Sequence, residues 1–333
     1  MDIIFPYRKD KSKIEVYLED DSGNTAVKGR RYSKKIIDFD RSYIKEIYEK
    51  NSIFLGSEDY IVNSIIKKLG NQKSILMGIL NGTPDSFYSR SRVKNETIID
   101  NMISQKPDII DIGGESTRPG SSVIAPDEEF ERIKPVIEYV KSISKIPVSI
   151  DSRNPETVEK CLKYDIDYIN DISGFKNKNM IKIASENNVK NIVMHMIGTP
   201  QTMNNYTDYD DIIFEINNFF YEKIDEMLKN NIKPENIIID PGIGFSKDLR
   251  GNIDIIKSPW SFFIGFDTLF GASMKGFIGK ITGSGINDRL GGTIATSIYL
   301  SNNGVDILRL HDIQQNRDAI NIYNYIRNSL IND

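Results

Sequence analysis

The segment SILMGILN, residues 74–81, opens a pattern that continues to the end of the chain and decides the fold. A short apolar run, bounded by polar or glycine residues, alternates with a segment of helical periodicity. Continuous apolar runs of this length are typical of parallel strands buried on both faces. The predicted strands are Ile75–Leu80, Asp108–Ile112, Pro147–Ile150, Asp167–Ile172, Asn191–Met194, Asn236–Ile239, Thr268–Ala272 and Val305–Leu310.

A helical pattern follows every one of these strands. The predicted helices are Thr97–Gln105, Asp127–Ile143, Pro155–Tyr164, Asn179–Asn187, Tyr209–Asn230, Asn252–Phe263, Asp288–Asn302 and Ile313–Leu330. Eight strand–helix units in about 255 residues predict an α/β fold of the (β/α)8 TIM-barrel type. The rival is a doubly wound open sheet, which usually carries a glycine-rich phosphate loop after its first strand. No G-x-G-x-x-G follows Leu80, and Pro259 makes the seventh unit the least regular.

Residues 1–73 differ from this pattern and predict an N-terminal extension ahead of a barrel domain at 74–333. The extension is rich in Lys, Asp, Tyr and Ser. A strand is expected near Ile14–Leu18, and amphipathic helices are expected around Ser42–Lys50 and Glu58–Leu69. We expect the extension to pack on the outside or the bottom of the barrel. Its role does not follow from its residues.

Composition narrows the class of protein. The chain has 333 residues, 43 Lys and Arg against 47 Asp and Glu, and a formal net charge of −4. That balance argues against a nucleic-acid partner, which usually requires a basic excess. No apolar run is long enough for a membrane span, and no signal peptide precedes the charged residues that begin at Arg8. The single cysteine, Cys161, excludes an internal disulfide. A cytoplasmic enzyme is the expectation.

Polar residues stand at almost every predicted strand end. In a barrel these ends converge on one mouth. Four of them, Asp151, Asn170, Asp240 and Lys275, suit a planar, nitrogen-rich heterocycle. A buried carboxylate can accept from two ring N–H groups at once, an amide can pair with donor and acceptor edges, and a lysine can reach a ring carbonyl or nitrogen.

A second group of strand-end residues supplies donors for a phosphoryl group. Its members are Asn81, Thr117, Arg118, Arg309 and His311. Arginine can grip a phosphate in a bidentate fork. No G-x-x-x-x-G-K-[ST] loop is present, so hydrolysis of a nucleoside triphosphate by a P-loop is not expected. Each Asp alone could be a helix cap and each His could be structural, and it is the joint arrangement that favours a site.

At these same residues the chain closely resembles the dihydropteroate synthases, from about Ile75 to Leu330. The resemblance rests on long motifs in the family's order. They are MGILNGTPDSF (77–87), DIGGESTRPG (111–120), SIDS (149–152), INDISG (169–174), MHM (194–196), DPGIGFSK (240–247) and RLHD (309–312).

The resemblance implies a transferase that joins 6-hydroxymethyl-7,8-dihydropterin diphosphate to p-aminobenzoate and releases pyrophosphate and 7,8-dihydropteroate. It implies a Mg2+ cofactor, a homodimer and a target of sulfonamides. By similarity, the pterin ring would contact Asp151, Asn170, Met194, Asp240 and Lys275. The diphosphate would contact Asn81, Thr117, Arg309 and His311, with Asn81 also the Mg2+ ligand. The p-aminobenzoate would contact Thr117, Arg118, Pro119, Phe245 and Ser273. The catalytic residues would be Asp85, Asp151, Lys275, Arg309 and His311.

The sequence departs from the family pattern at three positions. Met274 stands where the family has Arg, Gly82 where Val is common, and Ser246 where Gly is frequent. Met274 and the extension leave open a non-catalytic pterin-binding paralogue, or a synthase that uses another arylamine acceptor. A pterin-barrel methyltransferase that acts on a corrinoid is a further alternative, although it should lack the TPDSF and STRP loops.

Overall fold

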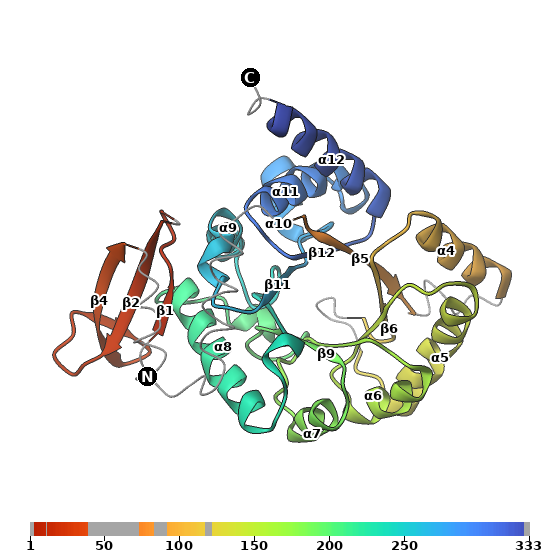
Figure 1. Cartoon of the computed structure of the whole chain (residues 1–333), viewed down its shortest axis with the longest axis horizontal. Coiled ribbons are helices and arrows are strands. Elements are labelled where there is room, and N and C mark those ends of the chain that lie inside the picture. Colours follow the sequence, from red (N-terminus) through yellow and green to blue (C-terminus); the bar gives the residue numbers. More distant parts are fainter. Residues whose placement is uncertain (1–2, 11, 39–72, 83–91, 117–121, 330–333) are drawn as a thin grey trace.

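The structure, a computed structural model, describes residues 3–10, 12–38, 73–82, 92–116 and 122–329. The two helices predicted around Ser42–Lys50 and Glu58–Leu69 lie outside these ranges, as does the loop from Thr83 to Ser91. The described chain forms an eight-stranded barrel ringed by helices, with a small sheet at one side (Figure 1).

The barrel is closed, and all its strand pairs are parallel, which confirms the predicted (β/α)8 fold. Its strands are β5 (Ile75–Asn81), β6 (Ile109–Gly113), β7 (Val148–Asp151), β8 (Tyr168–Asp171), β9 (Lys190–Met194), β10 (Ile237–Asp240), β11 (Asp267–Phe270) and β12 (Ile307–Leu310). Closure is made by β12, in which Ile307 pairs with Ile75 of β5. Every predicted strand is present, and each boundary is within about two residues of the prediction.

Helices follow the strands as expected, with corrections in the first, sixth and seventh units. The first helix begins at Arg92, five residues before the predicted start at Thr97. The helices are α4 (Arg92–Ser104), α5 (Pro126–Ile143), α6 (Pro155–Cys161), α7 (Lys178–Glu186), α8 (Ile212–Lys229), α9 (Leu249–Lys257), α10 (Gly276–Thr282), α11 (Leu290–Asn302) and α12 (Ile313–Ser329). The predicted helix 252–263 ends early, because Pro259 starts the separate 3-10 turn η4 (Pro259–Phe262). The helix α10, between β11 and α11, was not predicted.

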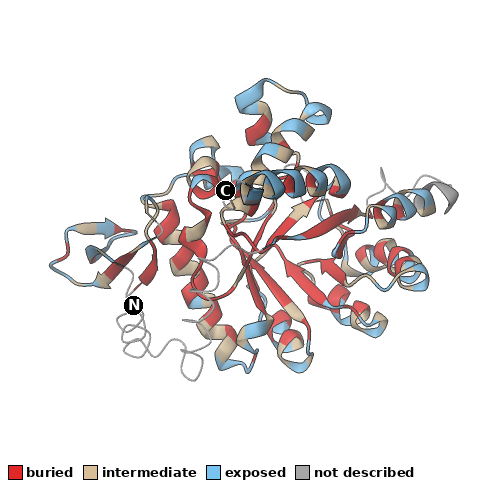
Figure 2. Cartoon of the chain, turned by 45° about the horizontal axis from the view of Figure 1, so that its top comes forward, coloured by how far each residue is buried: buried red, intermediate tan, exposed pale blue. Residues whose placement is uncertain are grey.

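An apolar layer fills the lower barrel interior. It takes one side chain from each of seven strands: Met77, Ile109, Tyr168, Ile192, Ile238, Leu269 and Ile307. The strands are buried along their length, whereas the ring of helices exposes its outer faces (Figure 2). Because the interior is a packed core, polar side chains can gather only above it, at the carboxyl ends of the strands.

The N-terminal sheet is antiparallel and lies outside the barrel, beside α8 (Figure 1). Its strands are β1 (Ile3–Pro6), β2 (Lys13–Glu19), β3 (Thr25–Val27) and β4 (Arg30–Asp38), in the order β1-β2-β4-β3. The predicted strand Ile14–Leu18 is the centre of β2, and the other three strands were not predicted. The described helices include none with the length and apolar character that crossing a membrane requires.

Candidate active site

An arginine between two aspartates forms the centre of the barrel mouth. Arg309 on β12 donates from Nε to Asp111 Oδ2 and from Nη2 to Asp151 Oδ2, each across 2.6 Å. Asn170 at the end of β8 donates its amide to the same Asp111 oxygen at 3.1 Å. Four strands thus contribute to one polar cluster, in which both carboxylates are buried.

Lys275 faces this cluster from the turn after β11. Its Nζ lies 4.1 Å from the centre of the Phe245 ring, a cation–π geometry. Asp240 is buried at the end of β10, where Oδ1 accepts from the backbone N–H of Gly242 at 2.7 Å. A Cβ on Gly244 would approach Lys275 Cδ to 3.1 Å, and the φ of Gly244 is +80°, so glycine suits this close approach.

Burial and neighbouring charges shift the pKa values in the mouth. Burial raises the pKa of Asp240 to about 6, although Lys275 lowers it in part. Burial raises the pKa of Asp151 against the opposing effect of Arg309. Desolvation, together with the positive charge of Arg309, lowers the pKa of Lys275 to about 8. Shifts of this size and direction, gathered in one mouth, are typical of a functional site.

Ser273 and His311 form a second pair at the rim. Ser273 Oγ lies 3.0 Å from His311 Nδ1 and accepts from the His311 backbone N–H at 3.2 Å. The resemblance had assigned these two residues to different substrates, and the structure makes them neighbours. A hydrogen-bonded hydroxyl and imidazole can together present donors to an anionic group.

Met274 lies between Ser273 and Lys275 in the left-handed region, with a φ of +58°. Two side chains fix its backbone. Thr293 Oγ1 accepts from the Met274 N–H at 3.0 Å, and Arg289 donates to the Met274 carbonyl at 3.1 Å. A left-handed conformation is uncommon outside glycine, asparagine and aspartate, and such strain persists where the surroundings fix it. These contacts hold Ser273 and Lys275 on either side of the turn.

An apolar wall closes one side of the mouth. Met194, at the end of β9, is buried in a cluster with Phe245 and three other side chains, Ile172, Met196 and Met203. The Phe245 ring of this cluster contacts the Lys275 ammonium. An aromatic and methionine wall next to polar groups is the usual lining of a site for a flat ligand.

The structure brings together most of the residues that the sequence analysis selected. Asp151, Asn170, Asp240, Lys275 and Arg309 converge, and Asn81 is half-buried at the end of β5. Arg309 was expected to contact the diphosphate. Its guanidinium binds Asp111 and Asp151, and Asp151 is one of the residues expected to hold the ring. Four selected residues, Asp85, Thr117, Arg118 and Pro119, lie outside the described residues.

Sequence reasoning missed three structural contributors. Asp111 anchors Arg309 and Asn170, and its signal was an aspartate inside the apolar strand IIDIG. Glu129 is buried and accepts from the side chains of Ser152, Asn154 and Thr157, at 2.8 Å each, just beyond Asp151. Asn154 precedes α6 without a side-chain cap, and its amide donates to Glu129.

The third is the buried pair of His195 and Lys247, whose ring Nδ1 and Nζ lie 3.2 Å apart. Burial and the charge of Lys247 lower the pKa of His195 well below its usual value. Burial lowers the pKa of Lys247 to about 7. Lys247 Nζ also donates to the carbonyl of Phe245 at 2.8 Å, so the pair supports the loop that carries the Phe245 ring.

Comparison with known proteins agrees with this geometry. The family model described as "Pterin binding enzyme" matches residues 77–311. The dihydropteroate synthase of Synechocystis sp. is 39% identical over 250 residues, which are 73% of this chain and 86% of the relative. A solved dihydropteroate synthase from Clostridium difficile, crystallised with pteroic acid, is 37% identical at a TM-score of 0.71, covering 77% and 97% of the two chains. The Xanthomonas albilineans enzyme, solved with 4-aminobenzoic acid, is 29% identical at a TM-score of 0.72, covering 77% and 94%.

The fold, the polar mouth and the family match together define a pterin-binding barrel enzyme. Within that class, the chain belongs to the dihydropteroate synthase family of transferases.

Proposed function

We propose that the protein condenses 6-hydroxymethyl-7,8-dihydropterin diphosphate with p-aminobenzoate to give 7,8-dihydropteroate and pyrophosphate. The observation that carries the proposal is the convergence of Asp151, Asn170, Asp240 and Lys275 on one mouth, above an apolar barrel interior. Relatives of the same family have been crystallised with pteroic acid and with 4-aminobenzoic acid, which supports both halves of the reaction.

The ring would lie on the apolar wall with its polar edges turned to the cluster. Asp151 and Asp240 would accept from ring N–H groups, and Asn170 would pair with a mixed donor and acceptor edge. Lys275 would donate to a ring carbonyl or nitrogen. Met194 would contact a face of the ring, since it lies in the buried wall.

In the proposed step the bond between the pterin methylene carbon and the diphosphate oxygen breaks, and its electron pair leaves with the diphosphate. The amine nitrogen of p-aminobenzoate then forms the new bond to that carbon and loses a proton. The developing positive charge on the pterin is stabilised by Asp151 and Asp240, with Asp85 also placed there by similarity. Arg309 and His311 would stabilise the negative charge on the leaving group. The arylamine is already nucleophilic, so no strong base is required.

Magnesium fits this site as an ion carried by the substrate. The described residues contain no group of three or more His, Cys, Asp or Glu able to hold a metal ion. Mg2+ commonly keeps several waters and binds substrate phosphates with only one or two protein ligands. Asn81, half-buried at the end of β5, would be such a ligand. When bound, Mg2+ would neutralise part of the diphosphate charge.

The acceptor would bind at the rim, where Ser273 and Phe245 meet the ends of β10 and β11. Ser273 would donate to the carboxylate of p-aminobenzoate, and the Phe245 ring would enclose the arene. Thr117, Arg118 and Pro119 are assigned here by similarity alone. By similarity alone, Thr83, Pro84, Asp85 and Phe87, which lie outside the described residues, would help to exclude water, which would otherwise capture the pterin cation.

One observation favours a second candidate, a synthase with a different arylamine acceptor. Met274 stands beside Ser273 where the family has arginine, and its sulfur lies 3.7 Å from Thr293 Oγ1 of α11. An arylamine without a carboxylate would not need that arginine.

We further propose that the protein is a homodimer formed through barrel helices remote from the mouth. Support comes from exposed apolar side chains on α12, including Ile322, Tyr325 and Ile326, and from Tyr299 on the adjacent α11. Patches of this kind often mark protein interfaces. A cytoplasmic location stays a prediction.

The proposed function is tested by pyrophosphate release from purified protein with the pterin diphosphate, Mg2+ and one of several arylamines. We expect release that depends on p-aminobenzoate, matches 7,8-dihydropteroate formation and stops when EDTA removes Mg2+. Absence of release with every arylamine would leave the non-catalytic paralogue as the better account.

A further inference from the structure

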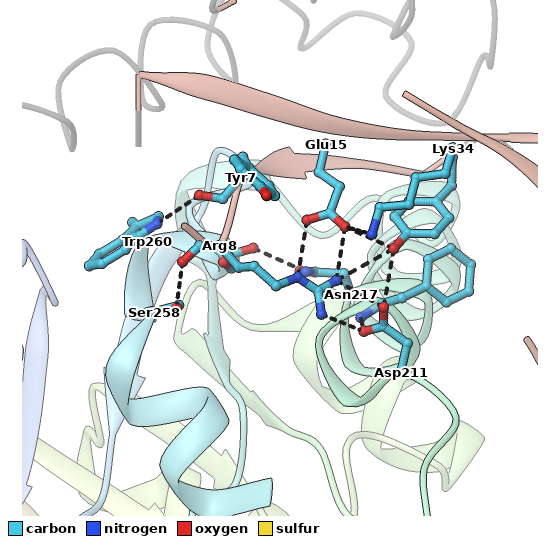
Figure 3. A network of polar contacts seen from close by, with 11 residues as sticks. Tyr7, Arg8, Glu15, Lys34, Asp211, Asn217, Ser258 and Trp260 are labelled. Atoms are coloured by element: carbon cyan, nitrogen blue, oxygen red, sulfur yellow. Dashed lines mark hydrogen bonds and ion pairs between the residues drawn. The ribbon is translucent and has the colours of Figure 1, made fainter. Parts of the chain in front are cut away.

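A network around Arg8 fixes the N-terminal sheet to the barrel (Figure 3). Arg8 donates from Nη1 and Nη2 to the two carboxylate oxygens of Asp211, at 3.0 and 2.9 Å. It also donates from Nε and Nη2 to Glu15 of β2, at 3.1 and 3.0 Å. Glu15 is fully buried, so this double fork provides the charge that the carboxylate needs and fixes the direction of both partners.

The same network holds the start of α8. Asp211 is the N-cap residue, and its side chain accepts from the Phe214 N–H at 3.1 Å. The hydroxyl of Tyr17 donates to Asp211 at 3.1 Å, and the Phe214 ring packs on Tyr17 with centroids 4.5 Å apart. One residue earlier, Asp210 accepts from the backbone N–H of Lys28 at 3.1 Å. The N-terminal sheet therefore forms hydrogen bonds with two consecutive residues of the barrel, Asp210 and Asp211.

The residue before them, Tyr209, reaches the other way, toward the mouth. Its hydroxyl donates to the Ser246 carbonyl at 3.0 Å and lies 3.2 Å from Ser246 Oγ. Ser246 Oγ accepts from the Ile197 N–H at 3.0 Å, so this hydroxyl joins the loop after β9 to the loop after β10.

Ser246 has a left-handed backbone, with a φ of +49°, at a position where the family often has glycine. The neighbouring residue is Phe245, whose ring lies under the Lys275 ammonium. Because a left-handed serine is strained, its hydrogen bonds help to fix the direction of the adjoining ring. Tyr209 is therefore the link between the segment that the sheet holds and the wall of the mouth.

From this chain of contacts we propose that the N-terminal sheet is a positioning element for the acceptor half of the site. Arg8 fixes the position of Asp211. Tyr209, two residues before it, links this fixed segment to Ser246, and Ser246 determines the orientation of the Phe245 ring. The family model matches residues 77–311, which do not include the sheet. The inference rests on the proposed contact between Phe245 and p-aminobenzoate. Neither Arg8 nor Tyr209 touches substrate in this account, and both act through Phe245.

The test is steady-state kinetics of the full chain with Tyr209→Phe, Arg8→Met and the double variant. Losing one hydrogen bond to a positioned loop should raise the KM for p-aminobenzoate about threefold to tenfold. The kcat and the KM for the pterin diphosphate should change less than about twofold, because the side chains expected to hold the pterin lie on the strands themselves and on the turn after β11, outside the loop that Ser246 fixes. If Arg8 acts through Tyr209, the double variant should be no worse than the more affected single variant.

Lys13→Met is the matched control, because Lys13 lies on the same sheet, has a side chain that is 43% exposed, and lies 4.0 Å from the Asp38 carboxylate. It should leave every kinetic constant unchanged. If Arg8→Met does not fold, Asp210→Ala takes its place, since Asp210 is exposed and accepts from the Lys28 backbone N–H of the sheet. An unchanged KM for p-aminobenzoate in Tyr209→Phe, or independent effects that multiply in the double variant, would overturn the inference. Wild-type turnover tests the proposed function separately.

Discussion

Arg309 donates to Asp111 across 2.6 Å, although 198 positions separate the two residues in the chain. The contact joins β12 to β6 at the mouth. Nη2 of the same guanidinium donates to Asp151. Burial opposes the charge of Arg309, but the two carboxylates raise its pKa, so it stays protonated. Because Asp111 shares Arg309, it determines how many acceptor positions of the Asp151 carboxylate remain for a ligand.

Asp111→Asn should weaken pterin binding about tenfold to hundredfold, the range expected for a lost charged hydrogen bond. Without the negative charge of Asp111, Arg309 would turn toward Asp151, and Arg309 and Asn170 would share a single uncharged amide oxygen. Isothermal calorimetry with the pterin substrate measures the effect. Asp306→Asn is the control, because Asp306 is also buried but accepts from Thr268 at the opposite end of the strands. Equal losses in both variants would contradict the role given to Asp111.

The pH dependence of kcat/KM for the pterin diphosphate should be bell-shaped. Asp151 and Asp240 must both be ionised to accept from the ring. The pKa of Asp240, about 6, and the raised pKa of the buried Asp151 set a loss of activity as the pH falls toward and through 6. Lys275 must be protonated to donate, and its pKa of about 8 sets a loss as the pH rises through it. Lys275→Met should abolish the alkaline limb and keep the acid limb. An alkaline limb that persists in this variant would exclude Lys275 as its source.

Glu129→Ala should lower the free energy of unfolding by about 2–4 kcal/mol, because three donors, of which Ser152 and Thr157 are buried, lose their acceptor. Urea denaturation gives the value. The neighbouring Glu128→Ala is the control, since Glu128 is exposed and forms a surface ion pair with Arg132 on the same helix. If both variants lost the same stability, Glu129 would not connect α5 to the turn that follows Asp151.

Much of the barrel could be predicted from the sequence, since each buried strand is a continuous apolar run. The mouth could be predicted as well, because strand ends in a barrel meet. The extension could not, since β1 and β3 are short, and β4, although it has nine residues, is mostly polar and without strong alternation. The role of Asp111 depends on a partner 198 residues away, which no local pattern contains. The place of Arg309 between two carboxylates is likewise a property of the closed barrel.

Met274→Arg should change the KM for p-aminobenzoate less than about fivefold. Thr293 and Arg289 fix the Met274 backbone, so Ser273 and Lys275 keep their positions whatever the side chain between them. Rate measurements with a panel of arylamines test this. A gain of tenfold or more with p-aminobenzoate in the variant would point to a different natural acceptor for the wild type.

The proposed function requires that the mouth hold a pterin ring through the carboxylates of Asp151 and Asp240. Calorimetric titration of the pterin diphosphate into wild type, Asp151→Ala and Asp240→Ala tests it most directly, with Asp306→Asn as the folded control. The account predicts tight binding to the wild type and to the control, and a loss of at least about tenfold in each alanine variant. Unchanged affinity in Asp151→Ala and Asp240→Ala would contradict it.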